Sequence, residues 1–310
     1  MRTLHTTPIF RACFMMMALA LCTAHAAASN EKQQDFVTQA YELDKYSAIS
    51  TSQGIRIVYA ASTERCNVNA KIDSRYADHF YVETKNGTLR IGFRNLNNIN
   101  LDKYGYSAIV TVFGPSDLKK LEASSAGSIE VTTPLEVDGT FSIVASSAGK
   151  ISTAALTCKK LDADASSAAD INLTNVNCQE ADLNSSSAAD ITVNGLASTK
   201  IDADASSTAN VTITGITCDE FKSSVSSQGK GEFEGTGKTV NLEASSAGKI
   251  EASQLLANAV ITSANTTGKI NCNSKNAIVK STSTDGTVNY SGKPVVINMN
   301  VGSDSSQPKM

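Results

Sequence analysis

Apolar and polar residues alternate with a period of two along most of the chain. In residues 161–165 (LDADA), Leu161, Ala163 and Ala165 are apolar, and the residues between them are aspartates. This period is typical of β-strands with one buried face and does not fit a helix. The pattern therefore predicts strands through the C-terminal two thirds of the chain.

A longer period is superimposed on this alternation, because the motif Ser-Ser-Ala-Gly-x-Ile recurs along the chain. Successive copies begin 18 to 22 residues apart, at Ser124, Ser146, Ser166, Ser186, Ser206, Ser226, Ser245, Asn265 and Ser283. The last position of the motif is aliphatic in every copy except one, where Gly231 stands. A unit of this length, built of short strands and tight turns and stacked on its own copies, is one coil of a β-solenoid.

The Ser-Ser pair is expected to mark a corner of each coil, with stacked hydroxyls hydrogen-bonded from coil to coil. Two residues beyond the pair, six copies have glycine, which suits a turn with positive φ. Ala169, Ala189 and Ala209 stand at this position in three other copies. Either the corner has ordinary dihedral angles there, or those three coils are strained.

The region before the repeat has a different composition. Residues 36–113 contain eleven of the aromatic residues, whereas residues 114–310 contain four. Segments such as residues 55–60 (IRIVYA) and 107–113 (SAIVTVF) are expected to be longer strands, and Asn86-Gly87 is a hairpin signal. We predict an all-β chain, a single-stranded β-helix or β-solenoid with coils of ~20 residues and an aromatic-rich N-terminal β cap.

The first residues are typical of a secretory signal peptide. Arg2 and Arg11 precede a short apolar run, residues 12–21. Ala24-His25-Ala26 then supplies the small-x-small pattern of a cleavage site. A lipid anchor at Cys22 is the alternative. The predicted organisation is a signal peptide (1–26), an N-terminal extension (27–40), the solenoid (41–301) and a disordered tail (302–310). Within the solenoid, residues 41–113 form the cap region and residues 114–301 the coils. The protein is expected to be exported to the periplasm, the cell surface or the medium.

Composition narrows the function. Of the 310 residues, 41% are hydrophobic but only 5% are aromatic and none is Trp, which suits a narrow aliphatic interior. The net charge is −3 and no basic cluster stands out in the sequence, which excludes electrostatic binding of nucleic acid and a polybasic membrane-surface protein. Beyond the signal peptide, no segment is long and apolar enough for membrane insertion.

Catalytic and zinc-binding signatures are not found. His79 is the single histidine left after cleavage of the signal peptide, and no GxSxG motif accompanies it. No CxxC, HxxxH or HExxH spacing occurs either. We therefore expect a protein that is not an enzyme, with no catalytic residue and no cofactor.

Stacked acidic residues are the one candidate metal site. Asp162, Asp182 and Asp202 recur every twenty residues, so they should lie in one exposed column, flanked by Asp164 and Asp204. Their oxygens could hold Ca²⁺ between coils. The alternative, which we favour, is a solvated acidic face whose repulsion is screened by solvent and salt.

Cysteines form another column. Cys158 and Cys178 are twenty residues apart, at the same place in adjacent coils. Residues so placed lie within the Cα separation that a disulfide bond can span, and an exported chain meets oxidising conditions. A bond between these two cysteines is possible in this arrangement, and a reduced ladder of small apolar residues is the alternative.

The order of these features resembles a family of secreted bacterial proteins, the putative auto-transporter adhesin, head GIN domain family. The resemblance covers about residues 41–294. It is carried by residues 43–59, 86–92 (NGTLRIG), 108–121 (AIVTVFGPSDLKKL), the Ser-Ser-Ala-Gly-x-Ile series and 286–294 (GTVNYSGKP). The family name implies adhesion and fixes no catalytic or binding residue.

The sequence leaves three functions open. The first is a non-enzymatic, secreted or cell-surface recognition protein that binds an extended glycan or a protein partner. The second is a carbohydrate-active β-helix enzyme, a polysaccharide lyase or hydrolase. The third is an envelope scaffold protein. Coils that stay within 18 to 22 residues leave no room for the loops that line the groove of such an enzyme, which favours the first.

Overall fold

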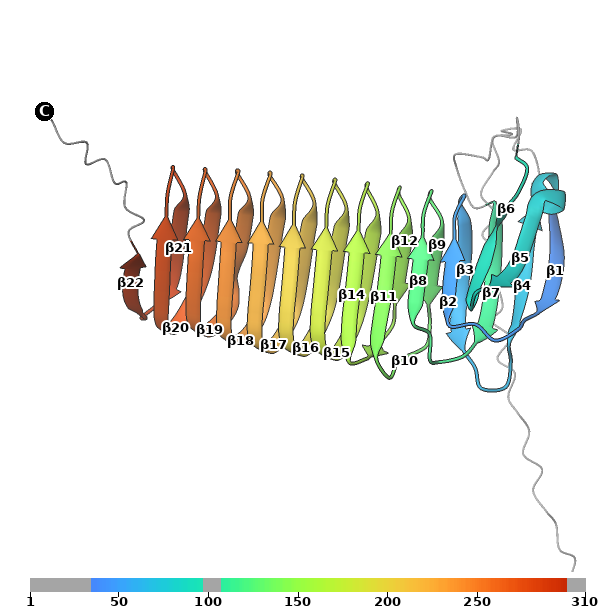
Figure 1. The fold of residues 1–310 in the computed structure, drawn as a ribbon, viewed down its shortest axis with the longest axis horizontal. Helices are drawn as coiled ribbons and strands as arrows, with labels where there is room; N and C mark the ends of the chain where they lie inside the picture. Colours follow the sequence, from blue (N-terminus) through green and yellow to red (C-terminus); the bar gives the residue numbers. More distant parts are fainter. Residues whose placement is uncertain (1–34, 97–106, 300–310) are drawn as a thin grey trace, which may run out of the picture. The chain divides into compact units, whose positions relative to one another are not determined.

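The computed structural model describes residues 35–96 and 107–299, all of which belong to one compact unit. The predicted signal peptide and the predicted tail lie outside the described residues. The described part is almost entirely strand and contains one helix, the 3-10 helix η1 (Ser74–His79). The predicted fold class is confirmed, because the strands wind into a β-solenoid of about nine turns (Figure 1).

Each coil has three faces, which are easiest to follow where separate strands form them. The first face holds β9 (Ser128–Val131) and β12 (Lys150–Thr153), and the second holds β10 (Leu135–Glu136) and β13 (Leu156–Thr157). The third face holds β8 (Lys120–Ala123), β11 (Thr140–Ala145) and β14 (Lys160–Ala165). Strands on one face pair in parallel with the same face of the next coil.

In the later coils, one long strand runs over all three faces. β15 pairs in parallel with β12, β13 and β14 in turn, through its residues 170–173, 176–177 and 180–185. The other long strands continue this parallel pairing, with local register shifts from β17 to β18, from β18 to β19 and from β19 to β20. These strands are β15 (Asp170–Ser185), β16 (Asp190–Ala205), β17 (Asn210–Val225), β18 (Lys230–Ala244), β19 (Lys249–Ala264) and β20 (Lys269–Thr282).

The interior is filled by the apolar half of the period-two pattern. Ile171 pairs with Ile151 on one side and Ile191 on the other, and all three are at most 1% exposed. The predicted inward stacking of this column is therefore confirmed. Burying an isoleucine side chain contributes about 1.5–3 kcal/mol, so these columns are a main source of stability.

The break in this column is filled from a neighbouring position. Gly231 faces inward where other coils have Ile or Val, and the Phe233 ring occupies the vacant space, with one ring carbon 2.6 Å from where a Gly231 Cβ would lie. The ring also packs edge-on against Phe221, with 4.7 Å between centroids. An aromatic ring therefore replaces an aliphatic side chain without leaving a cavity.

The Ser-Ser pair lies at the corner between the third and first faces, as expected. The turn closes with a main-chain hydrogen bond, such as Gly127 N to Ser124 O at 2.8 Å, and these turns lie along one edge of the stack (Figure 1). Hydrogen bonds along the corner join main-chain groups of successive turns, such as Ala148 N to Ser167 O at 3.0 Å. The main chain therefore provides the ladder that we expected from the hydroxyls.

The expectation of positive φ at the motif glycine is wrong. Positive φ falls on the two residues before it, for example 47° at Ser125 and 61° at Ala126, as in a type I′ turn. The glycine has ordinary dihedral angles and is needed for space, since a Cβ at Gly149 would lie 2.3 Å from the Ala123 carbonyl oxygen. Ala189, fully buried, stands at the same position with a Cβ and without positive φ. The corner as a whole does not have ordinary dihedral angles, because Ser187 and Ala188 before it have φ of 55° and 64°.

Two N-terminal strands extend the third and first faces of the solenoid, and they do so out of sequence order. β2 (Ala48–Thr51) lies between β6 (Thr88–Phe93) and β8, and β3 (Ile55–Ala61) lies between β7 (Ala108–Gly114) and β9. Antiparallel strands complete this end: β4 (Asn67–Asp73) on β7, β1 (Phe36–Glu42) on β4, and β5 (Phe80–Lys85) on β6.

Aromatic side chains fill the interior at this end. Phe80 packs edge-on against Phe93 with 5.7 Å between centroids, and Tyr76 of η1 packs on the same Phe93 ring at 5.9 Å. Tyr41 adds a fourth ring, 6.3 Å from Phe80. Four of the eleven aromatic residues of this region therefore form one packed cluster.

The other end is more open. β21 (Thr287–Gly292) and β22 (Val295–Met299) both pair in parallel with β20. Among the described strands, neither has a partner on its other edge (Figure 1).

Candidate functional site

A shallow groove runs across the outward side of the first face. Its volume is about 340 Å³, and it crosses the starts of β15, β16, β17 and β18. The outward residues of these strands supply its walls: Asp170, Asn172, Asp190, Thr192, Asn210, Thr212, Lys230 and Glu232. Because the strands are in register, chemically similar groups recur at the spacing of the coils, ~4.8 Å.

The charged residues of the groove are already paired. The Lys150 ammonium contacts Asp170 at 2.7 Å, the Asn210 amide donates to Asp190 Oδ1 at 2.6 Å, and Lys230 contacts Glu232 at 2.5 Å. By contrast, within the described residues no protein group bonds to the side chains of Asn172, Thr192 or Thr212. The groove therefore offers a row of unengaged hydroxyl and amide groups between charged groups that already have partners.

The predicted acidic column lies on the third face. Asp162 pairs in register with Asp182, and Asp182 with Asp202. The Lys160 ammonium lies between the first two carboxylates, 2.9 Å from Asp162 and 2.8 Å from Asp182. A protein cation thus occupies the place where we considered calcium.

The flanking column contains its own neutral spacer. Asp164 and Asp204 lie on either side of Asn184, whose amide donates to Asp164 Oδ1 at 3.2 Å. Within residues 35–96 and 107–299, no three or more His, Cys, Asp or Glu side chains are grouped so that they could hold a metal ion. The acidic face screened by solvent and salt, which we favour over a calcium site, stays a prediction.

Asp202 is the least satisfied member of the column. Lys222 is 3.8 Å away, and Asp202 Oδ1 is buried with no hydrogen-bond partner among the described residues. Burial raises the pKa of the Asp202 carboxyl, and the neighbouring Asp204 charge adds to this effect. The ionised form of Asp202 is therefore disfavoured in the folded protein.

Asp202→Asn should stabilise the protein at neutral pH by roughly 0.5 kcal/mol. A carboxyl whose pKa is raised by folding destabilises the folded state at a pH above its folded-state pKa. This destabilisation disappears as the pH falls through the folded-state pKa towards the pKa of the unfolded state. The gain in Tm should therefore shrink on acidification. Asp162→Asn is the control, because it removes an ion pair with Lys160 and should give no gain. Equal gains for both variants would contradict the role given to burial.

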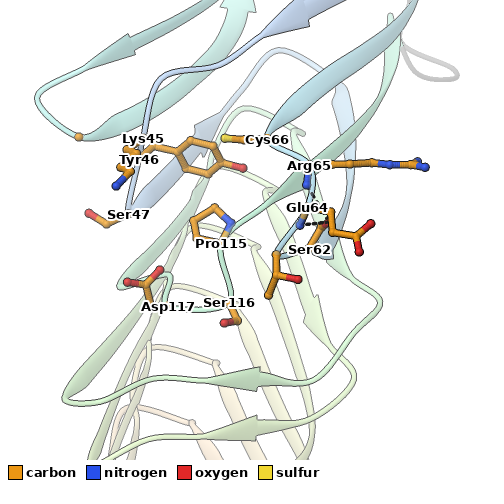
Figure 2. Close-up of a pocket in the computed structure, with 12 residues that line it drawn as sticks. Lys45, Tyr46, Ser47, Ser62, Glu64, Arg65, Cys66, Pro115, Ser116 and Asp117 are labelled. Atoms are coloured by element: carbon orange, nitrogen blue, oxygen red, sulfur yellow. Dashed lines mark hydrogen bonds between the residues drawn. The ribbon is translucent and has the colours of Figure 1, made fainter.

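A second pocket, larger than the groove, lies at the N-terminal coils and was not expected from the sequence. It has a volume of about 680 Å³ and lies among the segments 45–47, 62–66 and 115–117 and the turn at Gly87. Figure 2 shows the Tyr46 ring near Cys66 and Pro115, with the Arg65 side chain extending away from them. The inner wall is thus mainly apolar, and charged residues are at the rim.

Two buried tyrosines support this wall. The Tyr46 hydroxyl donates to the Phe113 carbonyl at 3.5 Å, and the Tyr59 hydroxyl donates to the Pro115 carbonyl. Burial raises the pKa of both phenols well above the ordinary value, so both stay protonated at physiological pH. One feature of the sequence could have indicated this pocket: Cys66, a cysteine outside the cysteine column, lies beside loops that are not part of the repeat.

The cysteine column forms as predicted, but its thiols are free. Cys158 and Cys178 are adjacent in successive coils and buried, and Cys178 Sγ lies 3.6 Å from the Ser198 hydroxyl. Contact with the Cys178 sulfur, together with burial, raises the pKa of the Cys158 thiol. A disulfide bond between the two stays a prediction.

His79 ends η1 at the exposed surface. Its Nδ1 lies 3.0 Å from the Arg94 carbonyl oxygen. This contact positions the ring against the main chain. None of the hydrogen bonds of the described residues joins it to a serine hydroxyl.

Comparisons with solved structures identify the same architecture in other proteins. A putative adhesin from Parabacteroides distasonis is 16% identical with a TM-score of 0.59, and one from Parabacteroides merdae is 14% identical with a TM-score of 0.58. A structure named putative lipid binding protein, from P. distasonis, is 15% identical with a TM-score of 0.54. Each comparison covers 86% of this chain and 98% of the other. At these identities the likeness shows the fold.

Sequence comparisons give the family. No curated protein matches the chain. Within residues 35–96 and 107–299, no helix has the length and hydropathy of a membrane span. The family model described as "Putative auto-transporter adhesin, head GIN domain" matches residues 45–214 and 176–294, which together cover most of the chain. The chain belongs to this family.

Proposed function

We propose that this protein is an exported, non-catalytic recognition protein that binds an extended glycan along the groove of the first face. The observation that carries the proposal is the row of unengaged side chains, Asn172, Thr192 and Thr212, on three successive coils. Hydroxyl and amide groups both donate and accept hydrogen bonds, as sugar hydroxyls do. A row at constant spacing suits a ligand that itself repeats.

The surroundings of this row support binding rather than catalysis. Asp170 already pairs with Lys150 and Asp190 already accepts from Asn210, so these two acidic residues of the groove are not the unengaged carboxyl pair that is typical of a polysaccharide hydrolase. From β8 to β22 the described coils stay short, and none of them carries an inserted loop that could build a deep cleft over the groove. The adhesin names of the family and of two similar structures are consistent with a recognition role at the cell surface.

A glycan array, followed by titration calorimetry on the strongest ligand, tests the proposal. The triple variant Asn172→Ala, Thr192→Ala, Thr212→Ala should weaken binding more than tenfold, because each lost hydrogen bond is worth about 0.5–1.5 kcal/mol. The three residues face outward, so stability should change little.

A matched variant on the third face provides the control. Ser142→Ala, Ser224→Ala, Asn241→Ala removes three outward polar groups from other strands, and affinity should stay within about twofold. Equal losses in both variants would contradict a site on the first face. If no glycan binds, but a protein captured from an envelope extract is lost with the first-face variant alone, the ligand is a protein partner instead.

A further inference from the structure

Exposed apolar side chains gather at the C-terminal end of the solenoid. Of the ten large apolar side chains that are exposed in the described residues, seven fall between residues 256 and 299. They are Leu256, Ile261, Tyr290, Val295, Val296, Ile297 and Met299. Val295 is 69% exposed, Met299 58% and Ile297 51%. Such a concentration at one end is more than the scattered exposure of a typical surface.

The outward columns of the third face change character along the stack. The column that holds Asp162, Asp182 and Asp202 continues into Ile261, Val279 and Ile297 in the last coils. Beside it, Ala259 and Ala277 lead to Val295. These positions point away from the interior, so the core does not require them to be apolar. We call the outward residues Ile261, Val279, Val295, Ile297 and Met299 the terminal apolar patch.

Lysines surround this patch. Residues 265–299 contain four lysines and one aspartate, a net charge of +3, although the whole chain has −3. Lys275, within β20, lies two residues before Ala277, and Lys293 lies two residues before Val295, the first residue of β22. Because Ala277 pairs with Val295, the two lysines are at the same place in successive coils. Lys280 follows Val279 directly but is in register with the buried Thr262, so it lies on the inward side of β20 and is not part of the outward surface. The average charge of the chain therefore conceals a cationic end.

A second copy of the chain does not fit this end well. Two copies meeting about a two-fold axis would bring Lys293 against its own equivalent. Pro294, immediately before β22, and lysines near an edge strand are devices that prevent edge-to-edge pairing. The composition of residues 300–310 does not suit them to cover the terminal apolar patch, since Val301 and Met310 are their only large apolar side chains.

We infer that the C-terminal end of the solenoid docks on an anionic lipid surface. The exposed aliphatic side chains of the terminal apolar patch enter the headgroup region, and Lys275 and Lys293 contact acidic headgroups. Apolar burial and cationic attraction together are the two terms that hold peripheral proteins at membranes. The groove of the first face then stays free, because its coils precede this end.

Flotation of the purified protein with vesicles tests this inference. Binding is expected to vesicles of phosphatidylglycerol and phosphatidylcholine and not to phosphatidylcholine alone, and it should weaken as salt is raised. Lys275→Gln with Lys293→Gln should weaken binding more than tenfold, since each basic residue near such a surface is worth roughly fivefold. Val295→Thr, Ile297→Thr, Met299→Thr should abolish binding while keeping strand-forming residues.

The N-terminal end supplies a matched control. Phe36 and Val37 are also exposed, so Phe36→Thr with Val37→Thr removes apolar surface elsewhere and should leave vesicle binding unchanged. Circular dichroism should show that all variants stay folded. The inference is overturned if the protein does not bind anionic vesicles, or if the control loses binding as much as the patch variant. It is also overturned if sedimentation shows a dimer that the patch variant abolishes while vesicles are not bound.

Discussion

Ile171→Asp is expected to lower the free energy of unfolding by at least about 4 kcal/mol, from lost apolar burial and an unpaired buried carboxylate. Ile171 is fully buried between Ile151 and Ile191, with no basic group in its column to pair with the new charge. Part of the loss should be recovered at low pH, where the carboxyl is protonated in both the folded and unfolded states. Urea unfolding between neutral and acidic pH measures both effects.

The neighbouring residue gives a control for this prediction. Asn172 follows Ile171 on the same strand and points outward, so Asn172→Asp adds the same charge in water and should change stability by no more than about 0.5 kcal/mol. Hydrogen exchange should show the damage of Ile171→Asp mainly in the coils on either side, since coils contact only their neighbours. Wild-type stability of Ile171→Asp would contradict the inward packing.

The repeat made these columns predictable because two periods agree. Period two decides which side of a strand a residue faces, and the ~20-residue period decides which residues stack. Ile171, Asp182 and Cys178 all lie where this reasoning puts them. The side-chain contacts of these residues are less predictable. Lys160 lies between two aspartates because of the direction of its side chain, which the two periods do not determine.

The N-terminal part could not be derived in the same way. It has no repeat, so nothing in the sequence indicates that β2 lies between β6 and β8. The N-terminal pocket depends on this order, because it joins segments around Tyr46, Cys66 and Pro115 that are distant in sequence. Likewise, the motif glycine was predicted to have a positive φ. The sequence alone does not distinguish a glycine needed for its positive φ from one needed because there is no space for a Cβ.

A second glycine shows how the chain absorbs a change of coil length. The coil that begins at Ser226 is one residue shorter than its predecessor, and the register between β17 and β18 shifts between Ile213 and Ile216. Gly235 pairs with Ile216 after the shift, with φ of 139°. A Cβ at Gly235 would lie 2.2 Å from the Ile216 carbonyl oxygen and 2.4 Å from its nitrogen. The shorter coil therefore closes only because this residue has no side chain.

Gly235→Ala should accordingly cost about 4 kcal/mol, from an unfavourable φ and from overlap with the Ile216 main chain. Gly139→Ala separates the two causes, because Gly139 has nearly the same φ, 133°, but no atom within 4 Å of an added Cβ. This control should cost about 2 kcal/mol from the dihedral angle alone. Urea unfolding of the two variants measures the difference, which is the energy of forcing the coils apart at the shortened turn. If Gly139→Ala were as destabilising as Gly235→Ala, close approach of the coils would not be the reason for glycine at position 235.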